Sequence, residues 1–192
     1  MSSTPRRSPL RATLVGGLAT VVGQLPVFLI GAMAVQITDD LLFGTAALGV
    51  AVAMFRVAGA VTSSYLGGLA DRIGAVASLR FAALISIVAS VGIAATATSW
   101  LTLVAWLMLG ATANVLAQPA ANRLLVRTVP ATRQGIAFGV KQSAPPAASM
   151  LAGVSVPVIA LTVGWRWAYL VGAALAIVVL IGAGSDHLVA NG

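Results

Sequence analysis

One short polar segment reads Gly67-Gly68-Leu69-Ala70-Asp71-Arg72-Ile73-Gly74 and separates two long apolar runs. The run before it, 41–66, is apolar or small except for Arg56, and the run after it, 81–100, carries no charge. About 20 apolar residues in a helix span the hydrocarbon core of a bilayer, which is roughly 30 Å thick. The pattern therefore predicts two membrane-spanning helices that are joined by a tight turn at the membrane surface.

The composition indicates a membrane protein rather than a soluble domain, because 59% of the 192 residues are hydrophobic and 8% are charged. The formal net charge is +7, but the arginines lie at the ends of apolar runs, so we expect no nucleic-acid partner. There is no cysteine, and the single histidine, His187, has no neighbouring ligand residues. We therefore expect no metal site, no cofactor and no catalytic residues, and no enzyme activity.

We expect one all-α membrane domain over 12–183, between short tails at 1–11 and 184–192. Its six predicted spans are 12–37, 42–66, 79–98, 100–121, 135–163 and 165–183. The runs are continuously apolar, whereas the strands of a transmembrane barrel alternate. The first run is too long for the apolar core of a signal peptide, which is usually roughly 7–15 residues, so we expect a retained helix.

The distribution of basic residues predicts the orientation of the spans. One set of loops and the N-terminal tail hold Arg6, Arg7, Arg11, Arg72, Arg80, Arg123, Arg127 and Arg133, and the opposite loops hold Asp39, Asp40 and Arg166. By the positive-inside rule, both termini are cytoplasmic. We expect a multi-pass protein of the inner (plasma) membrane of a bacterial cell. Aromatic residues near the outer ends are expected in the headgroup belt, namely Trp100, Trp165, Trp167 and Tyr169.

The polar segment resembles the loop signature between the second and third helices of the major facilitator superfamily, which reads roughly G-x-L-a-D-r-x-G-r-k-x-x-l. The matching residues are Gly67, Leu69, Ala70, Asp71, Arg72, Gly74 and Leu79, whereas Ala75 and Val76 replace basic residues. The segment 164–169 resembles the opening of the sixth helix, and 118–123 and 135–143 resemble a bacterial branch of the family. The resemblance implies a conformational-switch loop in which Asp71 faces a helix N-terminus across the interface between two halves.

A typical member of that family has twelve helices, so the resemblance implies a six-helix half built from two inverted three-helix repeats. The partners would be the lipid bilayer, a small-molecule solute and a second half, either in the same polypeptide or as a second copy. Two features depart from the family. Trp106 stands where an arginine usually precedes Gly110, and the glycine-rich motif of the fifth helix is reduced to Pro145 within 140–149. Both departures argue against a half of a drug-efflux antiporter, which stays an alternative beside a truncated or non-transporting scaffold.

Arg56 lies near the middle of the second predicted span, roughly 15 Å from the inner end of that span. A charged residue at that depth costs about 2.5–3.5 kcal/mol on insertion scales. The predicted spans contain no Asp or Glu that could pair with it. We expect Arg56 to face the translocation path, and the alternative is pairing with backbone carbonyl groups or lipid headgroups.

Other polar residues inside the spans are further candidates for contact with the solute. Lys141 and Gln142 lie beside Pro145-Pro146, which bend the fifth span, although Lys141 could also extend to the headgroups. On the fourth span, Gly110, Asn114, Gln118 and Asn122 recur every four residues and form one polar stripe. For this stripe and for Gln24, hydrogen bonding between helices is the first interpretation and solute binding is the alternative.

The sequence therefore predicts transport of a small polar, anionic solute by alternating access, in a secondary active or facilitative mode. Candidate binding residues are Arg56, Lys141, Gln142, Asn114, Gln118 and Gln24. The cationic candidates without acidic partners are the reason to expect an anion.

Overall fold

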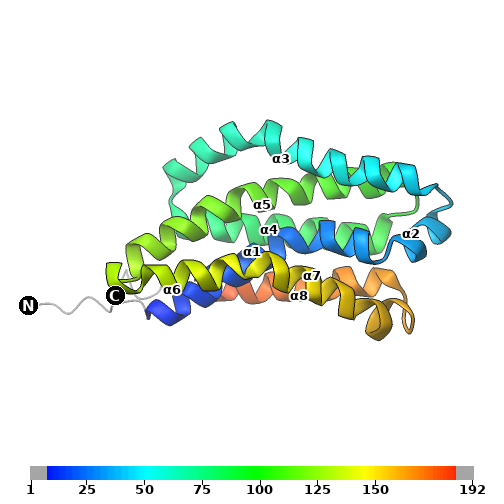
Figure 1. Ribbon diagram of the computed structural model, residues 1–192. Coiled ribbons are helices and arrows are strands. Elements are labelled where there is room, and N and C mark those ends of the chain that lie inside the picture. The colour runs from blue at the N-terminus through cyan, green and yellow to red at the C-terminus, as the bar shows by residue number, and fades with distance from the viewer. Residues whose placement is uncertain (1–7, 185–192) are drawn as a thin grey trace, which may run out of the picture.

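The computed structural model describes residues 8–184, and this part of the chain is helical throughout, without a strand (Figure 1). Its helices are α1 (Pro9–Ala32), α2 (Ala34–Leu41), α3 (Thr45–Ile73), α4 (Ala75–Thr96), α5 (Trp100–Thr128), α6 (Ala131–Gln142), α7 (Ala144–Ser155), the π-helical turn η1 (Val156–Ala160) and α8 (Trp165–Gly184). Most of both predicted tails, with Arg6, Arg7 and His187, lies outside the described residues.

Six helical stretches are long and apolar enough to cross a membrane. They are Pro9–Ala32, Thr45–Ile73, Ala75–Thr96, Trp100–Thr128, Ala131–Ala160 and Trp165–Ala183. This number confirms the predicted all-helical fold with six spans. The ends of the spans differ from the predicted ones by up to seven residues. The largest differences are at the ends of α3 and α5, because these helices continue into polar turns beyond the apolar length that hydropathy detects.

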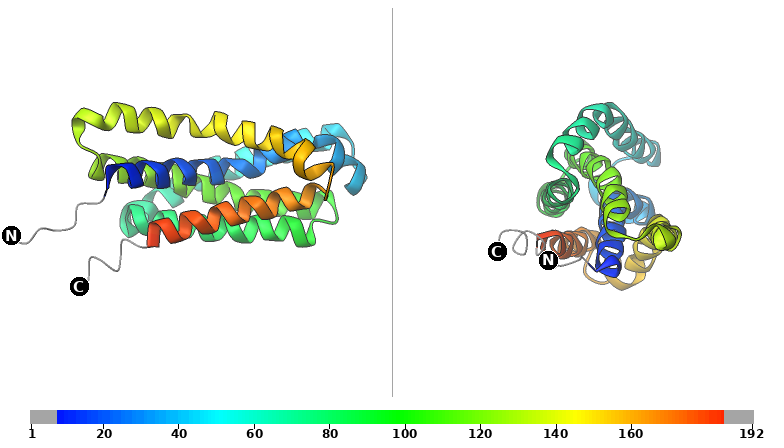
Figure 2. Two further views of the ribbon diagram at one scale, coloured as in Figure 1. Left: turned by 90° about the horizontal axis from the view of Figure 1, so that it is seen from below. Right: turned by 90° about the vertical axis from the view of Figure 1, so that its left-hand side faces the viewer.

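The helices form two layers, and α1 belongs to the larger one (Figures 1 and 2). In one layer α3, α5, α1 and α6–α7 follow one another, and in the other layer α4 packs on α8. The helix α5 also packs on α4, and α1 also packs on α8, which joins the layers. The beginning of α1 and the end of α8 lie at the same end of the bundle, which we call the predicted inner end. The opposite end, with α2, is the predicted outer end.

The first predicted span, 12–37, is not one helix. It begins earlier, at Pro9, and it is interrupted at Met33, after which the short helix α2 carries Asp39 and Asp40. The helix α2 ends at Leu42, whose φ of 53° turns the chain toward α3. The polar residues of α2 therefore lie beyond the apolar span, at the predicted outer end of the bundle.

The turn between the second and third spans is shorter than predicted. The helix α3 runs through most of the polar segment to Ile73, and α4 begins at Ala75, so Gly74 alone reverses the chain. Its φ of 84° is accessible to glycine without steric cost. Gly67, Leu69, Asp71 and Arg72 consequently belong to the last turns of α3 rather than to a loop.

Small residues allow close contact between neighbouring helices. A Cβ atom at Gly23 of α1 would lie 3.0 Å from the Cα of Asn114 on α5, and one at Gly92 of α4 would lie 2.5 Å from the ring of Trp106. The indole Nε1 of Trp106 donates to Thr96 Oγ1 of α4 over 2.8 Å. Trp106 therefore replaces the arginine expected by the family resemblance with a packing contact between α4 and α5.

Candidate substrate site

The buried ammonium group of Lys141 is the centre of the candidate site. Lys141 lies in the last turn of α6 and is 3% exposed. Its Nζ donates a hydrogen bond to Gln118 Oε1 of α5 over 2.5 Å and another to Gln142 Oε1 over 3.3 Å. Three of the predicted site residues are thus brought together by one amine, although Gln118 is 23 positions away in the sequence.

The packing of α6 and α7 explains why Lys141 points into the bundle. Ala137, one turn before it, packs against the end of α5, and Ala144 and Ala148 after it pack against Val21 of α1. These positions recur every three or four residues and therefore share one helix face. The alanines bring this face close to α1 and α5, and the lysine side chain fills the junction of the three helices.

The depth of Lys141 bears on whether it extends to the headgroups. Lys141 is ten residues from Ala131 at the start of α6, and Gln118 is ten residues from Thr128 at the end of α5, so both lie about 15 Å from the predicted inner end. The side chain does not extend along α6 toward that end. It turns across to α5, where its ammonium group is bound to the amide of Gln118.

The polar stripe of α5 divides into residues with different surroundings. Gln118 contacts Lys141, whereas Gly110 is buried near Ala89 and Asn122 is exposed. Asn114 lies at the crossing of α1 and α5, against Gly23, and its Oδ1 atom is buried without a hydrogen-bond partner among the described residues. Gln24, the next residue after Gly23 in α1, is half-buried.

The charge of Lys141 has no acidic partner in the part of the chain that the structure describes. The acidic residues of 8–184 are Asp39 and Asp40 in α2 and Asp71 near the end of α3, all of them at the ends of the bundle. The hydrogen-bond partners of Lys141 are two neutral amides. A buried cation held only by neutral groups is costly unless another group compensates its charge.

Arg56 lies on a different helix from this cluster. It is exposed on α3, and its guanidinium carbon lies 5.7 Å from the centre of the adjacent Phe55 ring. Within residues 8–184, Arg56 forms no hydrogen bond or ion pair with another side chain. The structure therefore separates the two cations that the sequence grouped as candidates.

Comparison with known proteins identifies the family. The model of the Major Facilitator Superfamily matches residues 16–185, which is most of the chain. The chain belongs to the major facilitator superfamily. It is thus a multi-pass membrane protein from a family of solute transporters. A search of curated proteins returned no match.

The signature segment of the major facilitator family carries an ion pair within this bundle. Asp71, near the end of α3, pairs with Arg123 of α5, and the Asp71 side chain is 67% exposed. The pair joins two neighbouring helices at the predicted inner end. A contact between Asp71 and a helix of a second half stays a prediction.

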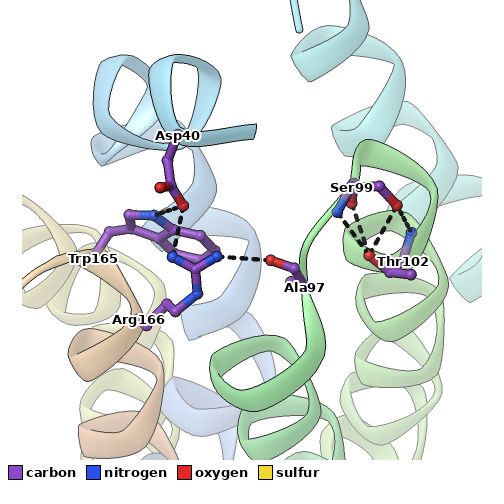
Figure 3. A network of polar contacts seen from close by, with 6 residues as sticks. All are labelled: Asp40, Ala97, Ser99, Thr102, Trp165 and Arg166. Atoms are coloured by element: carbon purple, nitrogen blue, oxygen red, sulfur yellow. Dashed lines mark hydrogen bonds and ion pairs between the residues drawn. The ribbon is translucent and has the colours of Figure 1, made fainter. Parts of the chain in front are cut away.

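A second polar network, at the predicted outer end, was not predicted (Figure 3). Arg166 at the start of α8 donates to Asp40 Oδ2 of α2 over 2.6 Å and to the Ala97 carbonyl oxygen over 2.9 Å. Trp165 Nε1 donates to the same Asp40 oxygen over 3.1 Å, and its ring lies under the guanidinium group of Arg166. We call Asp40, Ala97, Trp165 and Arg166 the outer clamp. The sequence did carry a signal for the outer clamp, because the opposite charges of Asp40 and Arg166 lie in loops at the same predicted end.

The burial and hydrogen bonds of the aromatic side chains correct several of their predicted roles. Trp165 is 4% exposed and Tyr169 is fully buried, so neither lies in a headgroup belt. Trp100 is partly buried, and its Nε1 donates to the Ala47 carbonyl oxygen of α3 over 2.8 Å. Only Trp167, which is exposed, has surroundings that suit a belt residue. Side-chain direction around a helix, rather than position along it, separates these residues.

Proposed function

We propose that this chain is one six-helix half of a transporter that moves a small polar, anionic solute by alternating access. The membrane would be the inner (plasma) membrane of a bacterial cell, with both termini in the cytoplasm. Membership of the major facilitator superfamily supports transport of a solute. The observation that carries the choice of an anion is the buried Lys141 ammonium group, whose hydrogen-bond partners are neutral.

The anionic group of the solute would compensate the charge of Lys141. A hydrogen bond to a charged group contributes about 1.5–3 kcal/mol, which is more than a neutral hydrogen bond contributes. Because Lys141 already donates to Gln118 and Gln142, both amides are positioned to contact a bound solute as well. Asn114 lies one turn before Gln118, at the crossing of α1 and α5, and together with Gln24 of α1 it would line the same path.

Arg56 would face the path at another level, nearer the predicted outer end. Its exposure on α3 and the lack of a charged partner in the described residues support this role. A guanidinium group that faces a hydrated path avoids the cost of burial in lipid. In this position it would attract anions toward the site at Lys141.

A second six-helix half would cover the open side of this bundle. The spans with the fewest buried residues are α3 and α6–α7, which lie at the two edges of one layer. Their exposed apolar side chains include Val57 and Val61 on α3 and Met150, Leu151 and Val154 on α7. The second half would come from the same polypeptide or from a second copy.

The test compares Lys141→Met with a matched loss of charge elsewhere, Arg133→Gln, at an exposed position of α6 near the predicted inner end. Uptake of a panel of small anions would be measured in proteoliposomes that contain the full-length protein. We expect Lys141→Met to insert normally, because the uncharged side chain lowers the cost of insertion, and to lower anion affinity about 10- to 100-fold. The Arg133→Gln variant should transport normally. Normal uptake by Lys141→Met would contradict the proposal.

A further inference from the structure

We infer that the site around Lys141 takes a monoanion and discriminates against dianions. The inference rests on the proposed function, because it names the charge class of the solute that binds at the same site. It follows from the number of positive charges at the junction of α1, α5 and α6, and from the distance between Arg56 and that junction.

The junction holds one positive charge. Of the basic residues in 8–184, Lys141 alone is buried, and the partners around its amine are neutral. Arg123 and Arg166 are paired with Asp71 and Asp40 at opposite ends of the bundle. One anionic charge would therefore neutralise the site, and a second would be left without a partner.

The register of α3 and α5 places Arg56 well away from Gln118. At the predicted outer end Trp100 contacts Ala47, 53 positions earlier, and at the inner end Arg123 pairs with Asp71 at nearly the same offset. This offset puts Arg56 level with Leu109 of α5. Gln118 lies nine residues further along α5, a distance of about 14 Å.

The two cations also lie on opposite sides of the layer. Helix α3 packs mainly on α5, whereas α6 packs on α1 and on α5. The guanidinium group of Arg56 lies near the Phe55 ring of its own helix, whereas Lys141 reaches α5 from the far side. A small anion bound to Lys141 therefore does not reach Arg56 with a second charged group.

The amide groups beside Lys141 add neutral donors to the single charge. Lysine can only donate, so the amides of Gln118 and Gln142 turn their oxygens toward it and their NH₂ groups away. Neither NH₂ group donates a hydrogen bond within the described residues. One ammonium group and two amide donors can bind the oxygens of one anionic group, but they do not supply a second counter-charge.

Size-matched pairs of anions test the inference. Binding to the full-length protein in nanodiscs would be measured by calorimetry at pH 7 for methanesulfonate and sulfate, butyrate and succinate, and benzoate and terephthalate. Within each pair that binds, we expect the monoanion to bind at least about 100-fold more tightly, because an unpaired buried charge is strongly unfavourable. The preference should persist in Arg56→Leu, and the affinity for monoanions should fall about 10- to 100-fold in Lys141→Met.

The outcomes separate the inference from the proposed function. Equal or tighter binding of the dianions by the wild-type protein would overturn the monoanion inference and leave anion transport standing. Dianion binding that disappears in Arg56→Leu would show that one solute bridges both cations, which also overturns the inference. Failure of every anion to bind, with binding of n-butylammonium instead, would overturn the proposed function itself.

Discussion

Arg166 and Lys141 are both cations held by hydrogen bonds inside one bundle, but their partners differ. Arg166 contacts the Asp40 carboxylate, the Ala97 carbonyl oxygen and the Trp165 ring, so the fold itself compensates its charge. Lys141 is more deeply buried and contacts two neutral amides. The difference separates a cation that joins three parts of the fold from one whose charge has no acidic partner in the described residues.

The strongest way to break this comparison is to give Lys141 an acid of its own. In Gln118→Glu, the introduced carboxylate would pair with the ammonium group and compete with a bound anion. We expect anion affinity to fall at least about 100-fold, because the pair is buried, while the melting temperature of the protein does not fall. Calorimetric titration and thermal unfolding of the full-length protein would measure the two effects.

The matched control for this variant is Asn122→Asp. It adds a carboxylate one turn further along the same helix, at an exposed position. Anion affinity should stay within about twofold of the wild-type value, because exposed charges interact weakly. If Gln118→Glu retained wild-type affinity, Lys141 would not be the group that binds the solute.

A smaller effect is expected when the outer clamp is broken. Arg166→Gln removes an ion pair, a hydrogen bond to Ala97 and a contact with the Trp165 ring. Because the Arg166 and Asp40 side chains are partly exposed, we expect a loss of about 1–2 kcal/mol in the free energy of unfolding. Anion affinity should be unchanged, since the clamp lies at the predicted outer end.

Asp40→Asn and the double variant complete a thermodynamic cycle for the clamp. The two single changes should be non-additive, because both remove the same ion pair. Denaturant unfolding would measure the stability, and calorimetry would measure the affinity. A large loss of anion affinity in Arg166→Gln, without unfolding, would mean that the clamp also belongs to the binding site.

The smallest effect on stability is expected at the exposed ion pair between Asp71 and Arg123. The Asp71 side chain is 67% exposed, so Asp71→Asn should change the free energy of unfolding by less than about 1 kcal/mol. If Asp71 takes part in the conformational cycle, the rate of transport should fall while anion affinity is retained. An unchanged transport rate would make the pair an ordinary surface contact.

The fold could be predicted further than the site could. Continuous apolar length determined the number of spans, and Gly67 to Gly74 carried the family resemblance that the family match confirmed. The ends of the helices were harder to predict, because the polar residues after Leu66 continue α3 instead of forming a loop. Hydropathy reports transfer into lipid, and it does not detect where the backbone hydrogen bonding of a helix stops.

The candidate residues show the same limit at the level of side chains. Lys141 and Arg56 have equal charge, and the sequence placed Arg56 near the middle of a span and left Lys141 within reach of the headgroups, yet Lys141 is the buried one. Their different surroundings follow from contacts between distant helices, such as the alanine face of α6–α7 against α1 and α5. Trp165 illustrates the converse, since its position near a helix end suggested a belt although its side chain is buried.

The sequence by itself determined six apolar segments long enough to span a membrane within residues 8–184 and the membership of a transporter family, because apolar length and local motifs depend on neighbouring residues. The tertiary structure alone decided that Lys141 meets Gln118, that Arg56 lies at another level, and that Arg166 is compensated by Asp40. Each of these outcomes depends on the direction of a side chain around its helix and on the register between helices, which are set by packing over the whole bundle.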